Sequence, residues 1–279
     1  MLSAGMFSLS ATGPVAPTAA NVSYAVPPSS CTGCPRCMCM DIYAPTNSSA
    51  DGAPFVLFLH GGLWYSGARG EIAEVCSAVL ELSSNTVGCA TADYSYSQDL
   101  GGSCKAGVPT YSAQASQVRV ALESLQARPE VDASRVLLGG HSAGGHLAAW
   151  LSLTWAATEQ PQRQQPPPIA FAGVEGIYNA SLWDTYQKSR WKGSFHCADW
   201  QAAPTTCPLS NTAWLLLLLP KLRYMHRYPP SISHCSLQAF GDPKQHWADG
   251  WVQGSPSAIA LTAAPVAPLL LIHSPQVES

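Results

Sequence analysis

The run Gly140-His-Ser-Ala-Gly144 places a serine between two glycines, with one residue on either side. It follows an apolar segment of strand length and precedes a segment with helical periodicity. Small flanking residues permit a sharp strand-to-helix turn that exposes the serine hydroxyl, and a helix start directs amide N–H groups at a developing negative charge. The pattern therefore predicts that Ser142 attacks a carbonyl carbon and that the amide of Ala143 stabilises the resulting oxyanion.

A second glycine motif precedes the serine in the chain. His60-Gly61-Gly62 ends an apolar run, and glycines let backbone amides approach a substrate without an intervening Cβ. A glycine-rich loop in this position supplies oxyanion donors in one broad group of serine hydrolases. We therefore predict donors at the amides of Gly61 and Gly62. Trp64 and Tyr65 are expected to contact an apolar or aromatic part of the substrate, although core packing is an equally good explanation for each.

Both motifs follow predicted strands that alternate with helices. Apolar runs predict strands at 54–59, 86–94, 135–139, 169–174 and 269–273, and helical spacing predicts helices at 72–80, 113–125 and 145–157. This alternation is typical of the α/β class, with a mostly parallel sheet and helices on both faces.

The domain is expected to span residues 38–279 after a flexible leader at 1–37, whose first thirty residues carry no charge. Residues 178–266 are rich in Trp, Tyr, Pro and His and are too long for an ordinary connection. They predict either a cap-like insertion over the site or an irregular segment along the sheet edge.

Four further segments carry a resemblance to a known family. Met40-Asp-Ile-Tyr-Ala-Pro45, His60-Gly-Gly-Leu-Trp64, Gly140-His-Ser-Ala-Gly-Gly-His-Leu-Ala148 and Gly176-Ile-Tyr-Asn179 are similar to α/β-hydrolases of the branch that contains hormone-sensitive-lipase-like esterases and kynurenine formamidases. Ala239-Phe-Gly-Asp242, Trp247 and Gly254-Ser-Pro256 resemble the formamidase subgroup. The resemblance implies an α/β-hydrolase fold, no cofactor, and a small-molecule ester or aryl formamide as substrate of Ser142.

The acid and the histidine of a catalytic triad have no clear counterpart. In this fold they follow the serine, yet only six residues come after the strand at 269–273, with Glu278 as their one carboxylate. We therefore expect the last strand and helix of the fold to be missing. The candidates for a recruited base are the histidines of the insertion, His196, His226, His234 and His246. A catalytically inactive binding protein and an incomplete gene model are the alternatives to an active enzyme.

Composition excludes several classes of function. The 279 residues have 11% charged residues and a net charge of −3, so no basic surface is expected for nucleic acid or anionic lipid. The longest apolar stretches, 213–220 and 263–272, are shorter than the roughly 20 residues of a membrane span. We expect a protein without a membrane span, and the pattern leaves its oligomeric state open.

The ten cysteines include four within Cys31–Cys39. This crowding does not fit the two separated knuckles of a structural zinc site, so no metal is expected. Disulfides would need an oxidising compartment, which the Asn-x-Ser sequons at Asn21, Asn47 and Asn179 would suit, although such matches arise by chance in a serine-rich chain. The N-terminus has no charged start typical of a secretory signal, so the compartment stays open with a preference for the cytoplasm.

Overall fold

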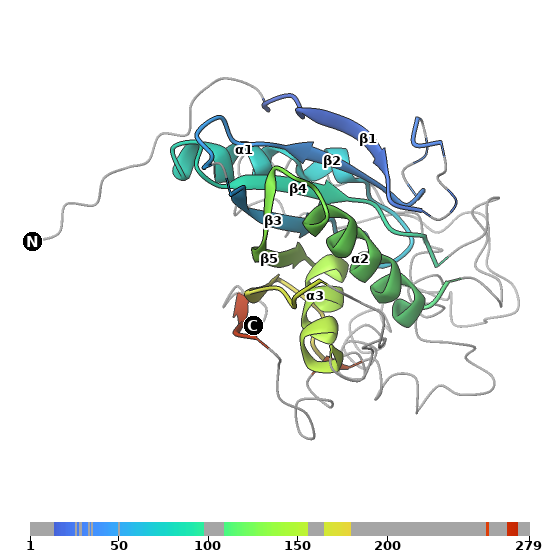
Figure 1. The fold of residues 1–279 in the computed structure, drawn as a ribbon. Coiled ribbons are helices and arrows are strands. Elements are labelled where there is room, and N and C mark those ends of the chain that lie inside the picture. Colours follow the sequence, from blue (N-terminus) through green and yellow to red (C-terminus); the bar gives the residue numbers. More distant parts are fainter. Residues whose placement is uncertain are drawn as a thin grey trace, which may run out of the picture.

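The computed structural model describes residues 14–25, 27, 30–32, 34, 36–49, 51–97, 109–155, 165–179, 255–256 and 267–272. They form a seven-stranded sheet with the order β1-β2-β4-β3-β5-β6-β7 (Figure 1). The strands are β1 (Ala19–Ser23), β2 (Cys39–Tyr43), β3 (Ala53–Leu59), β4 (Gly88–Ala92), β5 (Val131–His141), β6 (Ala170–Val174) and β7 (Leu269–Ile272). The first two pairings, β1 with β2 and β2 with β4, are antiparallel, and the others are parallel.

The helices cover both faces of the sheet. They are η1 (Arg69–Ile72), α1 (Ala73–Leu82), α2 (Tyr111–Gln126) and α3 (Ala143–Thr154). Figure 1 shows α2 and α3 side by side. Side chains of both helices pack in the main hydrophobic core, which also contains Ala90 and Ala92 of β4. Cys89, the residue before Ala90, points to the opposite face and packs with Cys76 and Leu80 of α1. The predicted fold class, a mostly parallel sheet with helices on both faces, is confirmed.

The expectation of a flexible leader at 1–37 is wrong for residues 19–23. They form β1, which pairs with β2 through a register shift between Ala19 and Val22. Asn21, within this irregularity, has a positive φ of 56°. A short strand with a bulge breaks the alternation of period two, and this leaves little signal in the sequence. Most of the predicted insertion lies outside the described residues, as does any element after β7.

The described cysteines pair as Cys31–Cys39, Cys34–Cys37 and Cys76–Cys89. The cluster at 31–39 is therefore closed by two disulfides and does not present free thiolates to a metal. The third disulfide joins α1 to β4 within the small hydrophobic cluster that contains Cys76, Leu80 and Cys89. No helix among the described residues is long and apolar enough to cross a membrane.

Candidate active site

Ser142 occupies a strained turn between β5 and α3. Its backbone has φ 54° and ψ −117°, which L-residues rarely adopt. The Ser142 N–H donates to the carbonyl of Val174 at 2.9 Å, and its own carbonyl accepts from the N–H of His146 at 2.9 Å. The serine therefore lies at the carboxyl ends of β5 and β6, at the start of a helix. Strain held in this way by its surroundings is characteristic of a nucleophile elbow.

Close backbone approach brings the end of β3 to this turn. A Cβ at Gly144 would lie 2.6 Å from the carbonyl oxygen of Leu59 and 2.5 Å from that of His60. Only glycine fits between α3 and the end of β3 at this distance. The packing places the segment after β3 beside the nucleophile.

That segment, residues 60–67, is called the glycine loop below. A Cβ at Gly61 would lie 3.0 Å from the Cβ of Ser142, so the loop lies directly beside this serine. The carbonyl of Gly62 accepts from the N–H groups of Tyr65 at 3.1 Å and Ser66 at 3.0 Å, which closes a tight turn. Gly62 has φ 115°, and a Cβ there would lie 2.0 Å from the carbonyl of Ser66. The sequence motifs at 60–62 and 140–144 thus meet in space.

A buried group of charges lies under the start of the glycine loop. Asp93, with no exposed surface, accepts from the Arg69 N–H at 2.6 Å and forms an ion pair with its guanidinium. The Nε of Arg69 is 3.0 Å from Asp41, and its Nη2 donates to Asn21 at 2.5 Å. This cluster joins β1, β2, η1 and the end of β4. Sequence reasoning missed it, because the only signal is a carboxylate directly after an apolar strand.

His60, the first residue of the glycine loop, lies beside this cluster of charges. Its ring stacks on Tyr94 at 4.4 Å, its carbonyl accepts from the Tyr94 hydroxyl at 2.9 Å, and its Nε2 lies 3.8 Å from Asp93. Burial lowers the pKa of His60 to about 4, so the imidazole is neutral at neutral pH. Burial also disfavours the charged form of Asp93 and raises the pKa of its carboxyl to about 7, although the neighbouring Arg69 acts to lower that pKa. His60 therefore supports the loop from within the core.

The two residues expected to contact substrate are both buried. Trp64 has no exposed surface and belongs to the main core, and Tyr65 is 7% exposed beside Tyr96. The positive φ values of Leu63 (52°) and Trp64 (66°) accompany this inward turn of the chain. The prediction of Trp64 as a substrate wall is corrected, because its indole packs against α3.

The candidate triad partners are only partly described. Three of the eight histidines lie in the described residues, and two of these, His60 and His146, are engaged inside the core. His141 precedes the serine, and burial lowers its pKa while Glu175 raises it. Glu175 directly follows β6 with φ 50° and is a carboxylate that sequence reasoning missed. The candidates named from the sequence, Glu278 and His196, His226, His234 and His246, lie outside the described residues.

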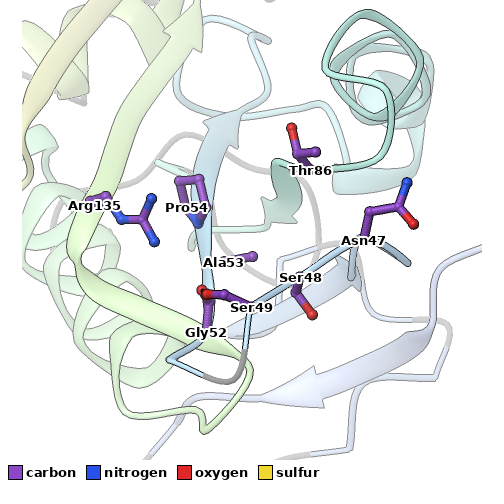
Figure 2. A pocket seen from close by; sticks show the side chains of 8 residues that line it. All are labelled: Asn47, Ser48, Ser49, Gly52, Ala53, Pro54, Thr86 and Arg135. Carbon is purple, nitrogen blue, oxygen red and sulfur yellow. The ribbon is translucent and has the colours of Figure 1, made fainter.

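A hollow of about 260 Å³ lies at the far end of the strands from Ser142 (Figure 2). It is lined by Ala53 and Pro54 at the start of β3 and by Ser49, Thr86 and Arg135 around them. The Nε of Arg135 lies 2.6 Å from Asp132. Ser142 follows the opposite, carboxyl end of β5, so this hollow is separate from the candidate active site.

Comparisons with known proteins agree with this arrangement. The family model BD-FAE matches residues 40–179, which is half of the chain and includes both glycine motifs. An inhibited esterase B from Lactobacillus rhamnosis superposes with a TM-score of 0.58 at 17% identity, over 91% of this chain and 64% of that one. Esterase 2 of Thermogutta terrifontis, phosphonylated by sarin, gives a TM-score of 0.50 at 16% identity, over 84% and 66%.

These likenesses show the fold, and the chain spans less than two thirds of the length of either esterase. The family match covers nearly all of the sheet from β2 to β6 together with η1 and all three α-helices. The chain therefore belongs to the BD-FAE family and has an α/β-hydrolase fold.

Proposed function

We propose that the protein is a serine hydrolase that cleaves carboxylic esters of small molecules through Ser142. The observation that carries this proposal is the contact between Gly61 and the Cβ of the strained Ser142. It brings the glycine loop beside the start of α3, and amides from these two segments are the donors that the proposed oxyanion stabilisation requires. The esterase names of the structural neighbours and the BD-FAE match support the same class.

In the proposed reaction, the Ser142 Oγ attacks the ester carbonyl carbon and its proton passes to a general base. The oxyanion accepts hydrogen bonds from the amides of Gly61, Gly62 and Ala143. The C–O bond to the alcohol then breaks, the alcohol takes the proton from the base, and water hydrolyses the acyl-enzyme. Neither His60 nor His146 can serve as this base, because both are engaged in the core, and the candidates remain His196, His226, His234 and His246.

An aryl formamide is the second substrate class, since Ala239-Phe-Gly-Asp242, Trp247 and Gly254-Ser-Pro256 resemble the formamidase subgroup. The segment Gly176-Ile-Tyr-Asn179, which resembles the whole branch, folds back after β6, where the Gly176 N–H donates to the Tyr178 hydroxyl at 3.2 Å. A non-catalytic binding protein is the alternative from another class. It is favoured because His60 and His146 are buried in the core and cannot serve as the general base.

Hydrolysis of p-nitrophenyl butyrate and of N-formylkynurenine by the wild type and by Ser142→Ala separates these proposals. An active serine hydrolase should exceed the alanine variant by roughly 10³-fold or more, since removal of the nucleophile leaves only residual catalysis. Preference for the first substrate supports an esterase, and preference for the second supports a formamidase. Equal rates for both proteins on both substrates favour a binding protein.

We also propose that the protein matures in an oxidising compartment, in place of the preference for the cytoplasm. Six described cysteines form three disulfides, a pattern that is rare where glutathione keeps thiols reduced. Intact mass spectrometry of alkylated protein from its native source tests this. Free thiols at Cys76 and Cys89 in unreduced samples would contradict it.

A further inference from the structure

The two halves of the proposed oxyanion site lie on different segments of the chain. The amides of Gly61 and Gly62 belong to the glycine loop after β3, and the amide of Ala143 begins α3. Oxyanion stabilisation depends on donors that are already in position, and an error of about 1 Å can cost roughly 100-fold in rate. The separation between loop and helix must therefore be held by contacts other than the substrate.

One side-chain hydrogen bond spans this separation. The Nε1–H of Trp64 in the glycine loop donates to Nδ1 of His146 on α3 at 3.1 Å, and both side chains are fully buried. The rings meet edge to face, with centroids 5.1 Å apart. His146 is one turn along α3 from Ser142, whose carbonyl accepts from its N–H. For Nδ1 to accept, the imidazole must be neutral with its proton on Nε2.

The backbone of Trp64 is held from the opposite side. Its carbonyl accepts from the Gln114 side chain of α2 at 2.7 Å and from the Ser97 N–H at 2.8 Å. His146 in turn packs edge to face against Tyr111 of α2, with ring centroids 5.8 Å apart. Hydrogen bonds thus hold both the backbone and the indole of Trp64, although its positive φ is unfavourable for such a residue.

We propose that Trp64 and His146 are positioning residues that set the distance between the glycine loop and the nucleophile helix. This inference rests on the proposed function for its effect on catalysis. Neither residue touches substrate, and the indole N–H acts through the loop backbone. The role differs from a packing role because it depends on one donor atom, which Trp64→Phe removes while an aromatic ring is kept.

Hydrogen exchange of the peptide covering 61–67 tests the positioning without requiring activity. In Trp64→Phe we expect exchange to be about tenfold faster, because a buried hydrogen bond that restrains local opening is lost. Trp150→Phe is the matched control: it makes the same change on α3 at a half-buried ring that packs against Tyr111. Equal exchange in the two variants would overturn the proposal.

Kinetics on the ester that the wild type hydrolyses supply the second readout. Trp64→Phe and His146→Leu should lower kcat by about 10- to 100-fold with little change in KM, because the loss falls on the transition state. His146→Gln keeps an acceptor and should recover most of kcat, which a purely structural role would not predict. A wild type without turnover would contradict the proposed function alone, and the exchange comparison would then decide the positioning by itself.

Discussion

The turn at Ser142 and the glycine loop meet at one point but are built in different ways. The turn depends on close backbone packing: a Cβ at Gly140 would meet the backbone of Gly144, and a Cβ at Gly144 would meet the carbonyl oxygens of Leu59 and His60. The glycine loop depends on side chains from distant parts of the chain, such as the hydrogen bond of Trp64 to His146, 82 positions away. The turn is therefore sensitive to a single added methyl group. The loop rests on several side-chain contacts, so the loss of one of them is expected to have a graded effect.

The largest effect is expected where the turn meets β3. Gly144→Ala places a methyl group against two backbone oxygens that cannot move aside, and we expect at least about 4 kcal/mol of lost unfolding free energy. Gly70→Ala is the matched control, since a Cβ there meets nothing within 4 Å, and it should change stability by less than about 0.5 kcal/mol. Urea unfolding of both variants measures the difference, and similar midpoints would refute the dependence of the turn on close backbone packing.

A smaller effect is expected in the charges under the glycine loop. Arg69→Met leaves Asp93 buried without its cation, which should cost about 3 kcal/mol of unfolding free energy. Arg135→Met removes a half-exposed partner of Asp132 and should cost less than about 1 kcal/mol. Should the two variants prove equally stable in urea, the buried cluster would not support the loop.

The smallest net effect on stability concerns the protonation of His60, because the titration of Asp93 offsets it. Its folded pKa of about 4 lies below the ordinary value of 6.5, so between these pH values only the unfolded chain binds the proton. The contribution of neutral His60 to stability is therefore complete above pH 6.5 and is lost as the pH falls to 4, about 3 kcal/mol in all. Asp93 acts in the opposite sense, because its raised pKa lets the folded state keep a proton below pH 7.

Because these two contributions oppose each other, the imidazole resonances are a clearer readout than the melting temperature. A ¹⁵N titration should show His60 neutral down to about pH 4. Protonation of His60 near pH 6.5 in the folded protein would show that the start of the loop is open to solvent.

The same contrast explains what the sequence predicts. The strands from β3 to β7, the three α-helices and the turn at Ser142 follow from periodicity and from glycine spacing, which are local signals. The ion pair of Arg69 with Asp93 and the core position of Trp64 arise from contacts between segments, so no local pattern reports them. Strand β1 escaped prediction for a related reason, since β2 supplies its hydrogen bonds and Asn21 interrupts its alternation.

The central claim is that Ser142 is an activated nucleophile beside preorganised amides. The most direct test is labelling of the folded protein with a fluorophosphonate, with Ser142→Ala as the control and peptide mass spectrometry to locate the adduct. The account predicts one phosphonyl group on Ser142 in the wild type and none in the variant. A folded wild type that stays unlabelled, or one labelled at another residue, would contradict it.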